Sequence, residues 1–232
     1  SVDGLRDTNH IYRQGVNWDN VERAMKSFTD AGGRARWDFL IFEHNEHQVD
    51  EAEELANDLG FEKFVKKKSG RFITSNIKPK EEHQAVNRKG EHTGKIAKPK
   101  EQNINLALLR QKEIEKSYGS MEEYFDKCII QCKVKNKGEI FITAEGLLMP
   151  CCWTAGRMYK WWMEDPYREQ IWDFIPDKTA LDARQGLDNV FATGIFDQIE
   201  SSWSITGCSN GKLKVCAMKC GVEWDPFKEQ FK

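Results

Sequence analysis

Cysteine is missing from the first 127 residues of this 232-residue chain, and all seven cysteines follow in its second half. The sequence opens on the polar stretch SVDGLRDTNH, which has neither a methionine nor an apolar signal segment. An odd number of cysteines without a secretory signal argues against a disulfide framework and favours free thiols in a cytoplasmic protein. Their clustering favours a metal site over scattered core residues. The cysteines are Cys128, Cys132, Cys151, Cys152, Cys208, Cys216 and Cys220.

The chain also lacks long apolar runs and an excess of either charge. No run approaches the roughly 18 apolar residues that a membrane span requires, so no membrane partner is expected. Lys and Arg number 35 against 37 Asp and Glu, a balance that argues against a nucleic-acid partner. No glycine-rich phosphate loop, G-x-S-x-G elbow or H-E-x-x-H motif is found. His44 and His47, in EHNEH, are therefore interpreted as exposed or capping residues, with a zinc site as the alternative.

The first third of the chain alternates between helix and strand patterns. Residues 17–32 have the apolar spacing of a helix, with Asn17 as its N-cap. Residues 34–42 predict a buried strand, 46–59 a second helix and FEKFV a second strand. This order is typical of a parallel sheet with crossover helices. Two or three such units cannot close a sheet, so we expect the first part of a larger barrel to be missing.

Residues 66–104 change character, since they are rich in charged residues and poor in apolar ones. They predict a long exposed loop, with an insertion that covers substrate or binds a partner as the alternative. Helical character returns over residues 105–127. Further on, GEIFITAEGLLMPCCW predicts strand, turn and strand, and residues 187–203 predict one helix with an apolar stripe.

Four cysteines have the spacing of a metal site. Cys132 and Cys151 flank the predicted hairpin and can meet at its open end. Cys216 and Cys220 are four positions apart, which places both thiols on one side of a helical turn. Four thiolates are the usual complement of a [4Fe–4S] cluster or a structural zinc ion. The alternative is a set of free, buried core cysteines.

The remaining cysteines are assigned differently. Neighbouring side chains on an extended segment point to opposite faces. If Cys151 faces a metal, Cys152 therefore faces away, and we expect it to pack near Trp153. Cys128 and Cys208 stay open, because either could replace one member of the Cys216 and Cys220 pair or be a core residue.

The cysteine pattern resembles that of a known family. Cys132, thirteen residues, Gly146, four residues and Cys151, the last within GLLMPCCW, match the opening of the Twitch or SPASM auxiliary-cluster domain of radical S-adenosylmethionine (SAM) enzymes. The resemblance implies one auxiliary [4Fe–4S] cluster, held by Cys132, Cys151, Cys216 and Cys220. The full SPASM domain binds two clusters and uses a C-x2-C-x5-C-x3-C motif, whereas this chain has no CxxC and too few cysteines for a second cluster.

The start of the chain resembles the fourth strand of the radical SAM barrel, and residues 28–61 resemble the fifth strand and helix. Ser1, Asp3, Gly4, His10 and Arg13 occupy the family's positions in SVDGLRDTNHIYRQG. By this resemblance Ser1, Asp3 and Arg13 are candidate SAM-binding residues. A hydroxyl suits the SAM ribose, and a guanidinium suits its carboxylate.

The resemblance implies an α/β fold in two domains. Residues 1–118 would form the C-terminal half of a partial (β/α) barrel with the polar insertion near 66–104. Residues 119–232 would form a small β-hairpin-plus-helix domain that binds the auxiliary cluster.

Radical chemistry needs a CxxxCxxC loop, which this sequence lacks. We therefore expect the C-terminal portion of an oxidoreductase, or a half that works with an N-terminal half supplied as a separate chain. An electron donor and a small-molecule or peptide substrate are implied, and the catalytic residues stay unassigned. The alternatives are a non-catalytic binding module stabilised by an iron–sulfur cluster or zinc, and an inert truncated product.

Overall fold

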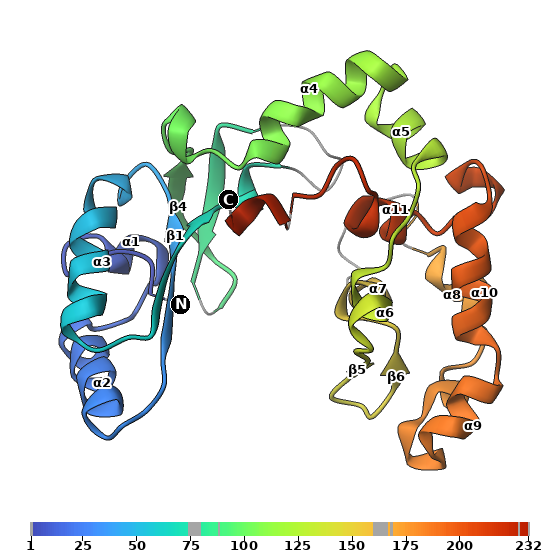
Figure 1. Cartoon of the computed structure of the whole chain (residues 1–232), viewed down its shortest axis with the longest axis horizontal. Helices are drawn as coiled ribbons and strands as arrows, with labels where there is room; N and C mark the ends of the chain where they lie inside the picture. Colours follow the sequence, from blue (N-terminus) through green and yellow to red (C-terminus); the bar gives the residue numbers. More distant parts are fainter. Residues whose placement is uncertain are drawn as a thin grey trace. The chain divides into compact units, whose positions relative to one another are not determined.

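The computed structural model describes residues 2–73, 80–87, 89–159, 167, 169–226 and 228–231. The chain divides into two compact units, the first made of Ser1–Leu109 with Pro226–Lys232 and the second of Arg110–Asp225 (Figure 1). The division falls within helix α4 (Leu106–Tyr118), close to the predicted boundary after residue 118. The last residues of the chain return to the first unit.

A parallel pair of strands, β1 and β2, is central to the first unit. The crossover between them contains helix α3, so the predicted strand–helix–strand order is confirmed. Asn17 caps α2 as predicted, because its side chain accepts a hydrogen bond of 3.1 Å from the Asn20 amide. In chain order the elements are α1 (Asn9–Tyr12), α2 (Trp18–Asp30), β1 (Arg36–Ile41), η1 (Glu46–Gln48), α3 (Val49–Asp58), β2 (Lys63–Lys68), η2 (Gly70–Phe72), β3 (Glu82–Val86), β4 (His92–Ala97) and η3 (Glu101–Asn103).

Strand β1 contributes to an apolar core on each face, because successive side chains point to opposite sides of a strand, although Arg36 is exposed and Asp38 is half-buried. Trp37, Phe39 and Ile41 pack in one core with apolar residues of α2 and α3. Leu40, together with Phe42 just beyond the strand, packs in a second core with residues of β3, β4 and α4. The mostly apolar run, interrupted by Arg36 and Asp38, therefore forms a strand between two cores.

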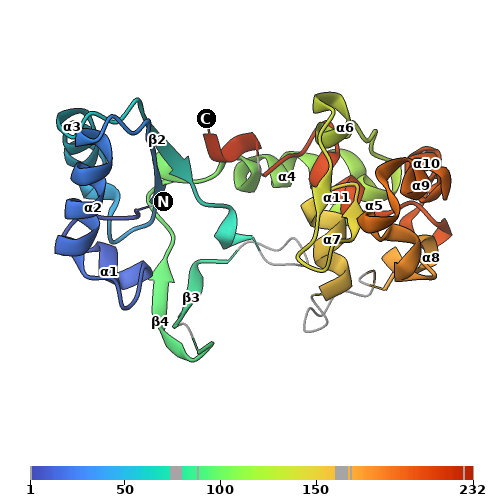
Figure 2. The same ribbon diagram turned by 90° about the horizontal axis from the view of Figure 1, so that it is seen from below.

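The expected exposed loop at 66–104 is wrong for much of that range. Strand β2 continues to Lys68, and β3 and β4 form an antiparallel hairpin, visible in Figures 1 and 2. Only one side chain of each hairpin strand is fully buried, Ala85 in β3 and Ile96 in β4, and both join the second core. The charged residues that suggested a loop occupy the solvent face of the hairpin. Residues 74–79 and 88 of the predicted loop lie outside the described residues.

The mixed α/β class is confirmed, since helices and three two-stranded sheets occur in the described part of the chain. The half-barrel stays a prediction, because the parallel sheet described has two strands. Within the described ranges, every helix is too short or too polar to cross a membrane.

The second unit is mostly helical and has one short antiparallel hairpin, β5 with β6, at the place where the sequence predicts strand, turn and strand. The one helix predicted at 187–203 is instead two helices, because Gly194 adopts a positive φ of 74° between them. Besides the end of α4, the elements are α5 (Met121–Lys127), α6 (Lys133–Lys137), β5 (Phe141–Ile142), β6 (Leu148–Met149), α7 (Cys152–Tyr159), α8 (Ile171–Phe174), α9 (Leu187–Ala192), α10 (Ile195–Ser201) and α11 (Lys214–Cys220).

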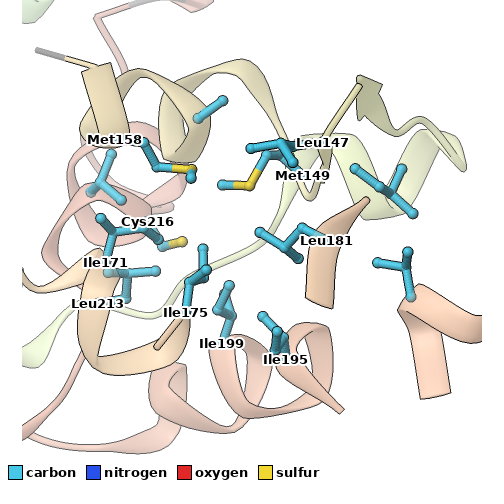
Figure 3. Close-up of a cluster of buried hydrophobic side chains, with 14 residues drawn as sticks. Leu147, Met149, Met158, Ile171, Ile175, Leu181, Ile195, Ile199, Leu213 and Cys216 are labelled. Carbon is cyan, nitrogen blue, oxygen red and sulfur yellow. The ribbon is translucent and has the colours of Figure 1, made fainter. Parts of the chain in front are cut away.

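One apolar core holds the second unit together (Figure 3). It takes Leu148 and Met149 from β6, Ile171 from α8 and Ile199 from α10. These side chains are at most 1 % exposed. Cys216, on α11, belongs to the same core, so one of the predicted metal ligands is also a packing residue.

The core predicts a large effect of truncation at Ile171, which is fully buried. Ile171→Ala should lower the free energy of unfolding of the second unit by about 2–5 kcal/mol, because it removes apolar contacts and leaves a cavity. Ile129→Ala is the matched control, since Ile129 is 76 % exposed, and it should change the same quantity by less than about 0.5 kcal/mol. Urea unfolding of both variants tests this; equal effects would contradict the assigned core.

Candidate functional site

The four cysteines predicted as metal ligands line one pocket of the second unit. They come from three segments of the chain, which the fold brings together. The pocket is otherwise mainly apolar, and its lining consists of Ile130, Cys132, Pro150, Cys151, Trp153, Thr154, Ile199, Trp203, Val215, Cys216, Lys219 and Cys220.

Each cysteine is placed by local structure. Cys132 is the N-cap of α6, where its Sγ accepts a hydrogen bond of 3.4 Å from the Lys135 amide. Cys151 lies between β6 and α7, directly after the predicted hairpin. Cys216 and Cys220 both belong to α11, one turn apart, as their spacing predicts.

The segment before Cys132 pairs with the end of α11. The Gln131 amide donates to the Cys220 carbonyl at 2.9 Å, and the Val222 amide donates to the Ile129 carbonyl at 3.0 Å. Ile130 and Gly221 form a β-bridge between these bonds. This pairing brings the first and the last of the four cysteines together.

The Cys132 and Cys220 thiols interact directly. A hydrogen bond from Cys220, helped by the Lys135 and Val134 amides, lowers the pKa of Cys132 to about 6. The same bond, together with burial, raises the pKa of Cys220. Cys132 is therefore the thiolate of the pair and Cys220 the thiol that donates to it.

The Cys151 and Cys216 thiols are the other neighbouring pair. Burial raises the pKa of Cys151, although the Thr154 hydroxyl, 3.5 Å from its Sγ, acts in the opposite direction. Burial also raises the pKa of Cys216, and the nearby charge of Cys151 adds to that effect. Both groups are therefore neutral thiols at pH 7 in the absence of a metal, which would deprotonate them on binding.

The pocket contains a buried donor without an acceptor. Among the described residues, the Trp203 Nε1 is buried and forms no hydrogen bond of acceptable geometry. It nevertheless lies close enough to the Cys216 sulfur to favour the thiolate form of Cys216. An anionic sulfur in the pocket would satisfy this N–H group, whose loss of hydrogen bonding otherwise costs free energy. No local sequence signal points to Trp203, which is 13 positions from Cys216, the nearest of the four cysteines.

Positive charge lies beside the thiols. The Lys133 Nζ is 5.3 Å from the Trp153 ring centroid and 2.7 Å from the Asp225 carboxylate. Its charge favours the thiolate of Cys220. Lys219 lines the pocket itself. These lysines offset part of the negative charge that four thiolates would bring together.

The thiols surround the pocket rather than converge on one point. Within the described residues, no group of three or more His, Cys, Asp or Glu side chains is close enough together to hold a single metal ion. Cys132 and Cys220 share a hydrogen bond, and the Cys216 thiol lies close enough to Cys151 and Cys132 for their charges to add to burial in raising its pKa.

The other three cysteines do not line this pocket. Cys152 is exposed as the first residue of α7 and borders a separate groove with Phe141 and Tyr159. It faces away from Cys151 as predicted, but the expected packing near Trp153 is wrong, because Cys152 starts a helix and is open to solvent. Cys128 and Cys208 are buried, and burial raises the pKa of Cys128 to about 11 and that of Cys208 to about 12.

The residues predicted to bind SAM belong to the first unit. Ser1 lies outside the described residues. Asp3 is fully buried, where its Oδ1 accepts from the Leu40 amide at 2.8 Å. Its Oδ2 accepts from the Arg13 Nε at 2.6 Å. The pair thus anchors the N-terminal segment to β1, and its role toward SAM stays a prediction.

The histidines of EHNEH are separate from the cysteines in sequence and belong to the other unit. The His44 ring stacks on Phe42 at 5.5 Å between centroids, and burial lowers its pKa to about 4. His47 is exposed. The predicted exposure is therefore confirmed for His47 and wrong for His44, which is half-buried against Phe42.

No protein-family model, curated protein or solved structure matches this chain. The function of the site is therefore inferred from its residues alone.

The thiol pair predicts a pH-dependent reactivity in the metal-free protein. Because a thiolate is the nucleophile, alkylation of Cys132 by iodoacetamide should decline as the pH falls through about 6. Cys220→Ala removes the largest cause of the lowered pKa, so the midpoint for Cys132 should move upward. Peptide mass spectrometry measures both, with buried Cys128 as the slow internal control. An unchanged midpoint in Cys220→Ala would contradict the hydrogen bond.

Proposed function

We propose that the second unit binds a [4Fe–4S] cluster through Cys132, Cys151, Cys216 and Cys220. The observation that carries the proposal is that these four thiols line one mainly apolar pocket. Four cysteine thiolates are the usual ligand set of such a cluster.

Two further features support a cluster over a structural zinc ion. The four cysteines are spread over the lining of one pocket, whereas a structural zinc ion draws its four ligands to one centre. The Trp203 N–H group is an available donor at the pocket wall. Hydrogen bonds to the sulfurs, together with burial, set the reduction potential of iron–sulfur clusters. The lining thus has the features that tune an electron-transfer cluster.

We further propose that the chain is the C-terminal portion of a radical SAM enzyme, in which this cluster is the auxiliary one. The support is the motif from Cys132 through Gly146 to Cys151 and the opening SVDG stretch. When bound, the auxiliary cluster would transfer an electron or anchor substrate. The CxxxCxxC motif that initiates radical chemistry is not in this sequence, so it must come from another segment or chain. Arg13 and Asp3 remain the candidate SAM-binding residues of the first unit.

The second candidate is a non-catalytic module in which the same four cysteines stabilise a binding domain. The missing CxxxCxxC motif favours it. A measurement of metal content distinguishes the zinc-stabilised form of this module from the first proposal, because a structural site needs no redox-active group.

Anaerobic reconstitution with iron and sulfide tests the cluster. The protein should take up about four iron and four sulfide per chain and turn brown. Cys132→Ala, Cys151→Ala, Cys216→Ala and Cys220→Ala should each lose most of the cluster absorbance, because each removes one ligand. Cys152→Ala is the matched control, since it removes an exposed thiol next to Cys151 and should retain the cluster.

Two results would overturn this assignment. One is a colourless protein that contains one zinc ion per chain and takes up no iron. The other is equal loss of cluster in Cys151→Ala and Cys152→Ala, which would mean that the pocket does not select between the two neighbours.

A further inference from the structure

Three basic side chains gather near the carboxyl ends of β1 and β2 in the first unit. Strand β2 ends at Lys68, and η2, which contains Arg71, follows almost at once. Lys80 follows the undescribed residues 74–79, and His83 belongs to β3. In open parallel α/β sheets, ligands bind beyond the carboxyl ends of the strands.

Short contacts hold these side chains together. The Lys80 amide donates to the Phe72 carbonyl at 2.9 Å, which places Lys80 beside η2. The Lys80 Nζ lies 3.2 Å from the His83 Nδ1. The Arg71 guanidinium lies over the Tyr12 ring, 5.2 Å from its centroid. Arg71, Lys80 and His83 are half-buried, so their orientations are restricted by packing.

Positive charge is concentrated here without a carboxylate to balance it. Burial and then Arg71 lower the pKa of Lys80, while burial, Lys80 and Arg71 lower the pKa of His83 to about 4. Within the described residues, no carboxylate is among the groups that shift either pKa. Two other lysines of this region differ, since Lys95 in β4 pairs with Glu82 at 2.7 Å and Lys98, just after β4, pairs with Glu81 at 2.6 Å.

Asp3 is an acidic residue near Tyr12, and it does not compensate the three bases. The charge of Asp3 contributes to raising the pKa of Tyr12, and the Arg71 guanidinium packs over the Tyr12 ring. Its carboxylate is already engaged by the Arg13 guanidinium, at 2.5 Å, and by the Leu40 amide. An external anion would therefore meet three donors and would relieve the repulsion between the Arg71 and Lys80 charges.

We propose that Arg71, Lys80 and His83 bind the phosphate group of a small-molecule ligand. The three roles follow from the chemistry of the side chains. The planar Arg71 guanidinium suits two phosphate oxygens, and the Lys80 ammonium supplies a point charge. Because Lys80 donates to the His83 Nδ1, the neutral His83 ring carries its proton on Nε2 and can donate to a third oxygen.

This site is independent of the proposed cluster. Its residues belong to the first unit, whereas the four cysteines belong to the second. Loss of one property therefore leaves the other to be measured separately, in the same full-length protein.

Titration calorimetry of the full chain with inorganic phosphate tests the proposal. The wild type should show saturable binding that weakens with added salt, because the contacts are charged. Arg71→Gln and Lys80→Gln should each weaken binding about tenfold or more, since each removes a charge-assisted hydrogen bond. Lys89→Gln is the matched control, as Lys89 is an exposed lysine of the same hairpin, and it should bind like the wild type.

A second measurement separates specific binding from general charge attraction. The ring resonances of His83 should move when phosphate is added and should not move with the same concentration of acetate. The proposal is overturned if phosphate shows no saturable binding at millimolar concentration. It is also overturned if Lys89→Gln weakens binding as much as Arg71→Gln, or if acetate binds as tightly as phosphate. Thermal unfolding near the wild-type midpoint shows that each variant is folded.

Discussion

The backbone pairing of residues 129–131 with 220–222 is the constraint on which the geometry of the candidate metal centre depends. It requires glycine at position 221, because a Cβ there would lie 2.6 Å from the Tyr124 Oη and 2.7 Å from the Ala217 carbonyl oxygen. The Tyr124 hydroxyl in turn accepts a hydrogen bond of 3.0 Å from the Trp224 amide. One close approach therefore holds α5, the end of α11 and the segment before Cys132 in register.

The candidate metal centre is also part of the core of the second unit. Ile199, Val215 and Cys216 line the pocket and belong to the apolar core at the same time. A group bound to the cysteines would thus contact residues whose burial stabilises the fold of the second unit. Metal affinity and folding free energy are coupled wherever ligands must be held in place by the fold. The pocket is consequently a structural element as well as a chemical one.

The parts of the structure that the sequence predicts are those with local signals. The Asn17 cap, the β5–β6 hairpin and the helical turn from Cys216 to Cys220 each depend on residues close in the chain. The β3–β4 hairpin was missed because Ala85 and Ile96 are its only fully buried strand residues. The position of Trp203 beside Cys216 depends on tertiary packing of α11 against other segments, so no sequence spacing could indicate it.

The candidate binding groups of the two units differ in charge: those of the first unit are mainly cationic, and those of the second are mainly neutral thiols. In the first unit Arg13, a candidate for the SAM carboxylate, is already paired with buried Asp3, so binding an external carboxylate would require it to share or leave that partner. No described carboxylate acts on the pKa of Lys80 or of His83, so an anion meets no such competitor at these two side chains. In the second unit burial favours neutral thiols at Cys151 and Cys216, a preference that only a bound metal can reverse.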